Sequence, residues 1–293
     1  MNPIKTSLLL AVFTIGLLSC SDEDFADGKT LNDLQFEYWS EPDKEARPIQ
    51  QIYQCTTPMK FRIGTNHSFK YRIFKPSTYD SSTKQFPLII YLHGLDARGT
   101  DNNAQMNYAA YYFLAYNNQY PAFVVYPQCP IDAYWGLKKR PENFSPNDME
   151  LNPKHSNMDY GICQLIADLG KNYPIDSQRI YIAGHSMGGI GTLDFIACHP
   201  DVFAAALSFC GTINPNRFTT SQEVPLFMLH NADDDVITVE GSRQTYRHLL
   251  QLDSEVVYHD GASGGHICWL DATKTPDMLE WLMSHSLSSR FDN

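Results

Sequence analysis

Ser186 stands in a setting suited to nucleophilic catalysis. It is the central residue of a GxSxG motif, Gly184–Gly188, which follows the apolar run Ile180–Ala183 and precedes a helical pattern over 187–199. A strand–turn–helix context of this kind holds the serine hydroxyl at the top of a sheet, beside a helix N-terminus that favours developing negative charge. Without catalysis, the same residues would be a glycine-rich turn with an incidental serine. The context favours Ser186 as a nucleophile.

A serine hydroxyl is a weak nucleophile and needs a base, which a carboxylate orients. On a strand–turn–helix nucleophile the partners follow in the order Ser, Asp or Glu, His. The acid is expected after the apolar run Leu226–Leu229, where Asp233, Asp234 and Asp235 are three adjacent candidates. We expect the base to be His266, at the end of a glycine-rich loop, with His259 as the competitor.

An oxyanion hole requires two backbone N–H groups. Met187, the residue after the nucleophile, is expected to supply one of them, and Leu95, in the loop after an apolar run, the other. The alternative for His93-Gly94, just before Leu95, is a plain strand-to-loop turn. Two further histidines are expected to pack around the site or support it: His185 and His230.

The elements that must position these residues alternate between strand and helix patterns. Residues 69–74 alternate between apolar and polar, which predicts a strand with one wet face. Short apolar runs predict strands at 86–91, 122–126, 180–183, 203–209 and 226–229, and a further strand is expected at 255–258. Helical patterns occupy 103–117, 158–172, 187–199, 238–252 and 276–287. Continuous apolar strands suit a parallel sheet covered on both faces, so the sequence predicts a doubly wound α/β fold, in one domain over 51–293. Ligands of such sheets bind at the carboxyl ends of the strands.

Four segments carry a family resemblance: 93–102 (HGLDARGTDN), 127–130 (PQCP), 174–189 (PIDSQRIYIAGHSMGG) and 265–269 (GHICW). With them the chain resembles the α/β-hydrolases of the esterase and predicted-peptidase group, which includes polysaccharide-acting feruloyl and acetyl esterases. The resemblance implies an α/β-hydrolase fold and carboxylic-ester hydrolysis without a cofactor. Asp234 holds the place of the acid in that family's HGxxDxxV pattern, although Asn231 stands where the family usually has glycine.

The N-terminus has the pattern of a targeting segment. Lys5 precedes an uncharged stretch, Ser7–Leu18, that is shorter than the roughly 20 residues a membrane span needs. Leu17–Cys20 resembles a bacterial lipoprotein box, which predicts a signal peptide over 1–19, lipid on Cys20 and a polar tether over 20–50. The acidic residues after Cys20 resemble the tag of surface lipoproteins, although a solvated linker would have the same composition. An ordinary secretory signal is the alternative.

Charge and cysteine content narrow the function classes. The 22 basic and 33 acidic residues give a net charge of −11, which disfavours nucleic acid and anionic lipid as partners. Membrane contact is therefore expected through the N-terminal lipid alone. Beyond Cys20, six cysteines could form disulfides in an exported protein, in any of 15 pairings: Cys55, Cys129, Cys163, Cys198, Cys210 and Cys268. No cysteine or histidine spacing suggests a metal site.

Substrate size is indicated by two loops. The short segment Gly211–Val224 leaves no room for a large lid, which suits a bulky polymer. The long stretch Pro130–Asn157 is of a length that is often functional. Tyr134, Trp135 and Trp269 could stack on a sugar or an aromatic acid, or could equally cover the core.

These observations predict an outer-membrane lipoprotein, facing the cell surface or the periplasm, that removes feruloyl or acetyl groups from plant polysaccharide or its oligosaccharides. Two alternatives remain open at this point. One is a serine peptidase of the same fold, and the other is a non-catalytic glycan-binding lipoprotein, against which an intact Ser186, Asp234 and His266 argues.

Overall fold

The computed structural model describes residues 52–64, 67–80, 83–151, 157–219, 223–268 and 277–291. The signal segment, the tether, Cys20 and Trp269 lie outside these residues. The strands are β1 (Thr56–Ile63), β2 (His67–Phe74), β3 (Phe86–Leu92), β4 (Phe123–Gln128), β5 (Ile175–His185), β6 (Ala205–Phe209), β7 (Leu226–Asn231) and β8 (Val256–Gly261). The α-helices include α3 (Tyr108–Ala115), α4 (Asn157–Asn172), α5 (Met187–Cys198), α6 (Val239–Gln251) and α8 (Asp277–Met283).

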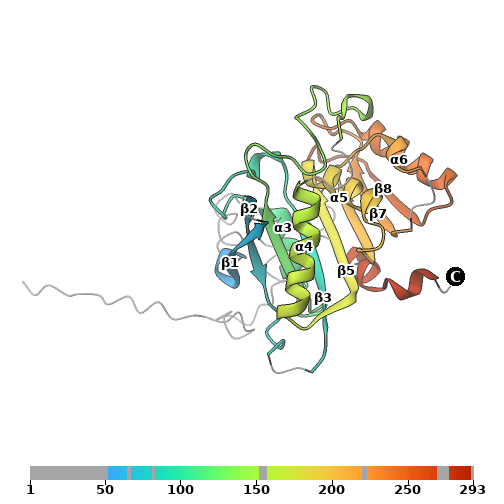
Figure 1. Ribbon diagram of the computed structural model, residues 1–293. Helices are drawn as coiled ribbons and strands as arrows, with labels where there is room; N and C mark the ends of the chain where they lie inside the picture. The colour runs from blue at the N-terminus through green and yellow to red at the C-terminus, as the bar shows by residue number, and fades with distance from the viewer. Residues whose placement is uncertain are drawn as a thin grey trace, which may run out of the picture.

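The eight strands form one sheet in the order β1-β2-β4-β3-β5-β6-β7-β8 (Figure 1). β1, β2 and β4 pair antiparallel, and the pairs from β4 through β3 to β8 are all parallel. The chain moves outward from β3 to β4 and then returns to β5 on the other side of β3. This is the doubly wound, mostly parallel α/β sheet that the strand and helix patterns predict, and it is confirmed.

The core lies on both faces of this sheet. Along β3, which is buried throughout, Leu88, Ile90 and Leu92 pack in one cluster with α4 and α5. Ile89 and Tyr91 point to the opposite face and pack in a second cluster with α3 and α8. Alternating side chains thus serve both layers, which is why the sequence of β3 is apolar without alternation. Figure 1 shows α4 crossing in front of the strands.

The first predicted helix differs from the observed one at its start. The pattern predicts a helix from residue 103, whereas α3 begins at Tyr108. The side chain of Asn107 accepts a hydrogen bond from the Ala110 N–H at 3.3 Å and so caps the helix at this position. Asn107 itself has an extended backbone, with φ −107° and ψ −179°, which the interior of a helix does not allow. The residues before α3 are therefore free to form a loop at the carboxyl edge of the sheet.

The loops above this edge match the expectation of a fold without a large lid. In the described part of Gly211–Val224 the regular structure is one short 3₁₀ turn, η5 (Pro215–Arg217). The described part of the longer stretch after β4 is packed, not free. It contains an antiparallel bridge between Leu137 and Leu151, and it shares a hydrophobic cluster with Ile190 of α5 and with Ile237. In Figure 1 this stretch, in green, lies above the sheet.

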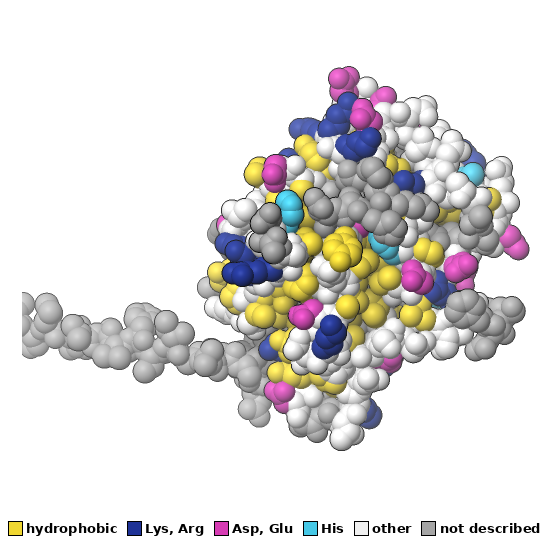
Figure 2. Space-filling view, viewed as in Figure 1, with side chains coloured by type: hydrophobic (Ala, Val, Ile, Leu, Met, Phe, Trp, Pro, Cys, Tyr) yellow, Lys and Arg dark blue, Asp and Glu magenta, His cyan; other side chains and the backbone are white. Residues whose placement is uncertain are grey.

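The surface carries charges of both signs. Figure 2 shows acidic and basic side chains interspersed around hydrophobic areas on one face. Among the described residues, the helices are too short or too polar to cross a membrane.

Candidate active site

Ser186 occupies a sharp turn between β5 and α5. Its backbone has φ 56° and ψ −122°, a conformation that a residue with a side chain rarely adopts. The Ser186 N–H donates to the Phe209 carbonyl at 2.9 Å, and the Ser186 carbonyl accepts from the Ile190 N–H at 3.0 Å. The strained turn is therefore held by β6 on one side and by the first turn of α5 on the other. The hydroxyl is left at the carboxyl edge of the sheet.

The two glycines of the motif are required by close packing. A Cβ on Gly188 would overlap the carbonyl of Leu92 at the end of β3, and a Cβ on Gly184 would overlap the carbonyl of Gly188. The helix therefore begins directly against the sheet because neither position carries a side chain.

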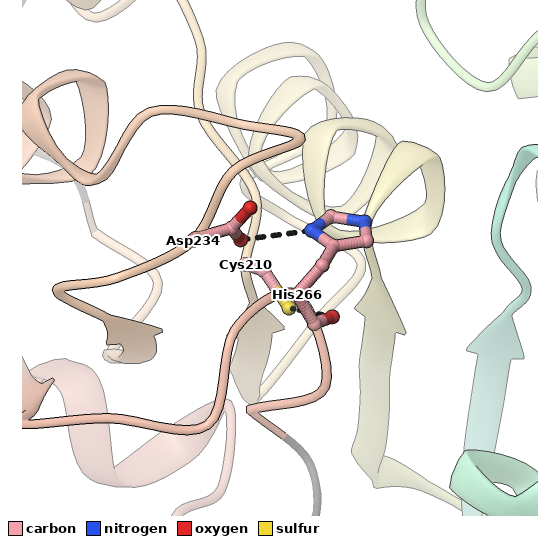
Figure 3. A group of neighbouring side chains, drawn as sticks. All are labelled: Cys210, Asp234 and His266. Atoms are coloured by element: carbon pink, nitrogen blue, oxygen red, sulfur yellow. Dashed lines mark hydrogen bonds and ion pairs between the residues drawn. The ribbon is translucent and has the colours of Figure 1, made fainter.

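His266 lies within hydrogen-bond distance of the serine. Its Nε2 is 2.8 Å from the Ser186 Oγ, and its Nδ1 is 2.8 Å from Oδ2 of Asp234. A carboxylate accepts only, so Nδ1 carries the ring proton and Nε2 is left to accept from the serine hydroxyl. Figure 3 shows the imidazole of His266 turned toward Asp234. The competitor, His259, is exposed on the edge strand β8.

Asp234 is the acid of the three candidates that reaches the histidine. Its side chain is fully buried, and its Oδ1 accepts from the backbone N–H groups of Val236 and Ile237 at 2.8 and 2.9 Å. Burial alone would raise the pKa of this carboxyl group. Hydrogen bonds from His230, His266 and the two backbone groups outweigh that effect and hold the Asp234 pKa well below its usual value. Asp234 therefore stays charged where its neighbour Asp235 is simply exposed.

Asp233 binds the backbone of the loop that precedes His266. Its two carboxylate oxygens accept from the backbone N–H groups of Gly264 and Gly265, at 3.1 and 2.8 Å. These bonds lower the pKa of Asp233, which lies at the surface. Both glycines have positive φ, 130° and 60°, so the turn before His266 uses a conformation that favours glycine. Asp233 thus holds the loop on which His266 lies.

His230, at the end of β7, supports the acid. Its Nε2 lies 2.9 Å from both Oδ2 of Asp234 and the carbonyl of Ile237. Both neighbours are acceptors, so Nε2 carries a proton and donates. On the other side of the ring, Nδ1 lies 2.7 Å from the hydroxyl of Ser242 on α6. His230, which was expected to pack around the site or to support it, thus makes a direct hydrogen bond to Asp234.

The two residues whose backbone N–H groups are expected in the oxyanion hole are each the first residue of a helix. Met187 is the first residue of α5, and Leu95 is the first residue of the 3₁₀ helix η3 (Leu95–Ala97). The first N–H groups of a helix have no acceptor within it, so both can face a substrate oxygen. His93 anchors the second loop, because its Nδ1 donates to the Gly94 carbonyl at 2.6 Å and its Nε2 accepts from the Cys129 N–H at 2.9 Å.

The neighbouring histidines are neutral. Burial lowers the pKa of His93 to about 4 and that of His185 to about 3. The ring of His185 stacks on Tyr91, and its Nδ1 lies 2.6 Å from the Tyr91 hydroxyl. A Cβ on Gly94 would touch His185. Both histidines are therefore packing groups of the site, as expected for His185.

A pocket of about 440 Å³ opens over the serine. It is lined by Gly94, Leu95, Asp96, Ala97, Ala104, Asn107, Ala109, Arg140, Phe144, His185, Ser186, Val236 and His266. Arg140 and Phe144 come from the long stretch after β4, and the guanidinium of Arg140 lies 5.8 Å from the centre of the Phe144 ring. This volume lies in the range of small-molecule sites.

Of the two alternatives for Trp135, substrate stacking is wrong, and packing against the core is what the structure shows. Its side chain is fully buried in the core, and its indole N–H donates to the His93 carbonyl at 3.1 Å. Tyr134 is half-buried, and one face of its ring is covered by the guanidinium of Arg98 at 4.3 Å. Trp269 lies outside the described residues. Trp135 instead braces the loop that carries Leu95.

Among the described residues, two groups bring potential metal ligands within 4.8 Å of one another. The first is Cys210, Asp234 and His266, where an ion would have to replace the hydrogen bond between the acid and the base. The second is Asp159, Asp194 and Cys198, where Nε of Arg217 already lies 2.8 Å from Oδ1 of Asp194. A cation at the second group would have to compete with this guanidinium.

One protein-family model matches most of the residues that form the sheet and its helices. The model of the Esterase family matches residues 64–256, a span that includes Ser186 and Asp234. The chain belongs to the Esterase family. The family resemblance that the sequence suggested is confirmed at the level of the Esterase family.

Two relatives are similar over part of the chain. One is a bifunctional acetylxylan esterase/xylanase of Neocallimastix patriciarum, 29% identical over 176 residues, which covers 58% of this chain and 23% of that protein. Another is poly(3-hydroxyalkanoate) depolymerase C of Paucimonas lemoignei, 30% identical over 172 residues, covering 58% and 37%. This chain therefore matches less than half the length of either relative.

Solved structures show the same fold. A thermostable esterase superposes with a TM-score of 0.70 at 30% identity, covering 80% of this chain and 64% of that one. A ferulic acid esterase of Anaeromyces mucronatus superposes with a TM-score of 0.54 at 15% identity, covering 74% and 86%, which shows the fold alone. The family and these relatives support a carboxylic-ester hydrolase.

Replacement of Ser186 by alanine should lower kcat about a million-fold, since a triad acts as a unit. Asp234→Asn should lower kcat about ten-thousand-fold, because an amide can donate to Nδ1 of His266 and so favour the wrong tautomer. Steady-state kinetics on a small activated ester would measure both effects. The matched control is Asp235→Asn, which should be near normal; near-normal activity in either of the first two variants would contradict the assignment.

Replacement of His230 by phenylalanine should lower kcat by about 10- to 100-fold with little change in KM, because Asp234 loses a donor and holds His266 less firmly. The comparison variant is His259→Phe, which changes an exposed histidine on β8. Equal activity of the two variants would mean that His230 does not support the acid. Circular dichroism would show that both variants are folded.

Proposed function

We propose that this protein is a serine carboxylic-ester hydrolase that removes acetyl or feruloyl groups from plant polysaccharide or its oligosaccharides. The observation that carries the proposal is the hydrogen-bond chain from Asp234 through His266 to Ser186, which ends in an open pocket. Family membership supports the reaction class. The xylan-acting relative supports the substrate class.

The proposed mechanism follows from the protonation states of the site. His266 accepts the Ser186 proton at Nε2 as Oγ attacks the ester carbonyl, and the imidazolium that forms is stabilised by the charged Asp234. The developing oxyanion is held by the N–H groups of Met187 and Leu95. His266 then returns the proton to the leaving alcohol, and an acyl group remains on Oγ. Water, deprotonated by the same Nε2, releases the acid and restores the serine.

Polymer access is supported by what surrounds the pocket. The segment between β6 and β7 contains only a short turn where described, so a sugar chain can approach Ser186 from above the sheet. Phe144 and Val236 offer apolar surface beside the serine, while Arg140 and Asp96 offer polar groups. A pocket of about 440 Å³ suits one acyl group and the sugar that carries it better than a long lipid.

Release of acetate and ferulate from native xylan should occur with the wild-type protein and not with Ser186→Ala. Chromatography of the released acids would measure the reaction and identify the acyl group. If neither acid is released while a small activated ester is cleaved, xylan is the wrong substrate and the hydrolase stands. If wild type also leaves that ester intact and fails to react with a fluorophosphonate probe, the hydrolase is overturned and the non-catalytic glycan-binding alternative becomes the leading one.

We further propose that the protein is a lipoprotein of the outer membrane, anchored through Cys20, with its catalytic domain at the cell surface or in the periplasm. The proposal is supported by the apolar segment Ser7–Leu18 and by the small residue Ser19 before the cysteine. The anchor would place an esterase beside a polymer that cannot enter the cell.

Cys20→Ser should abolish incorporation of labelled fatty acid and shift the protein from the detergent phase to the aqueous phase. The change removes the sulfur that would carry the lipid and leaves the catalytic domain intact, so ester cleavage should persist. Cys163→Ser is the matched control and should remain labelled. Lipid labelling that survives the Cys20 replacement would contradict the anchor.

A further inference from the structure

Two cysteines lie against each other beside the proposed catalytic histidine. The Sγ atoms of Cys210 and Cys268 are 2.7 Å apart, and both side chains are fully buried. Two sulfur atoms that are not bonded to each other stay considerably farther apart than this. Both are free thiols in the structure, and a disulfide would bring the two sulfur atoms to about 2.05 Å. The two residues are 58 positions apart in the sequence.

Cys210 and Cys268 lie on two segments that meet at the active site, the end of β6 and the loop of His266. Cys210 follows β6 directly, and its N–H donates to the Leu229 carbonyl of β7 at 2.8 Å. Its φ of 42° is unusual for a residue with a side chain, and it places Sγ 3.4 Å from the carbonyl of His266. Cys268 lies two residues after His266. In Figure 3 the sulfur of Cys210 lies beside the backbone carbonyl of His266.

We propose that Cys210 and Cys268 form a disulfide that ties the loop of His266 to the end of β6. Cys55 is already disulfide-bonded, and among the five free cysteines of the described residues Cys210 and Cys268 are a pair whose Sγ atoms lie 2.7 Å apart. The effect of this disulfide on catalysis rests on the proposed role of His266, whereas the existence of the disulfide does not depend on that role. The loop is already held on its N-terminal side by Asp233, and the disulfide would hold it on its C-terminal side.

The chemistry needs an oxidant, which we take to be a thiol–disulfide oxidant of the cell envelope or oxidised glutathione. Cys210 and Cys268 together lose two protons and two electrons and gain one S–S bond, while one S–S bond of the oxidant is reduced to two thiols. Burial raises the pKa of the Cys268 thiol well above its ordinary value, which makes the folded thiol a poor nucleophile. The bond would therefore form during folding, before the loop packs.

A peptide map tests the bond without reference to activity. The full chain is exported by a Gram-negative host through its own N-terminus, alkylated in denaturant without reductant, and digested with trypsin. Cleavage after Arg179, Arg217, Arg247 and Lys274 places Cys210 in peptide 180–217, together with Cys198, and Cys268 in peptide 248–274. We expect these two peptides to be joined in wild type and in Cys198→Ser, and separate in Cys210→Ser. Alkylation of both thiols in the wild-type protein would overturn the proposal.

A refolding comparison tests what the bond does. Wild-type protein is refolded in detergent either in a glutathione redox buffer or with excess reductant, so that the two samples differ only in their thiols. The oxidised sample should have a melting temperature higher by roughly 5–15 °C. Well below both melting temperatures, it should also have a kcat several-fold higher on a small ester, with a similar KM. The Cys198→Ser variant should show the same differences, and Cys268→Ser should show neither.

Equal melting temperatures and equal kcat values for the two wild-type samples would overturn the role assigned to the bond. Loss of ester cleavage in every sample, with the two peptides still joined, would instead overturn the proposed function and leave the disulfide standing.

Discussion

The site depends on keeping one buried carboxylate charged. Removing a carboxylate from water costs several kcal/mol unless donors replace the water. Asp234 receives two donors from the backbone just after it, at Val236 and Ile237, and two from imidazole rings, His230 and His266. The two backbone donors are in place once the chain turns after Asp234. The two imidazole rings come from the end of β7 and from the loop after β8. The buried charge therefore fixes the loops after β7 and β8 to each other.

The sheet sets the distance that the histidine must bridge. Ser186 follows β5 and Asp234 follows β7, with β6 between them. Neighbouring strands lie about 4.8 Å apart, so two spacings amount to roughly 10 Å. One imidazole with a hydrogen bond of 2.8 Å on each side spans much of such a gap, and the side chains of the serine and the acid make up the rest. The histidine can therefore come from any loop that reaches over β6, and here it comes from the loop after β8.

The sequence predicted local features well because each is decided by neighbouring residues. The GxSxG motif between an apolar strand and a helix predicted the turn at Ser186, and the apolar runs predicted the parallel strands. The start of α3 was missed because the cap at Asn107 competes with an apolar pattern that continues upstream of it. The choice between a substrate-stacking and a core position for Trp135 stayed open, because its environment is made by β3 and α5, which are distant in the sequence. The position of Arg140 and Phe144 in the pocket was missed for the same reason.

The residue that departs from the family pattern shows how such a site tolerates change. Asn231 stands where the family usually has glycine, and its side-chain amide donates to the Gly265 carbonyl at 3.0 Å, next to His266. The extra side chain is accommodated because the facing residues, Gly261 and Gly264, have no Cβ to meet it. The glycines of this loop raise the entropy cost of ordering it, and Asn231 and Asp233 offset that cost with hydrogen bonds from the other side. The orientation of the histidine is therefore shared between the loop after β7 and its own loop, so neither sequence motif alone determines it.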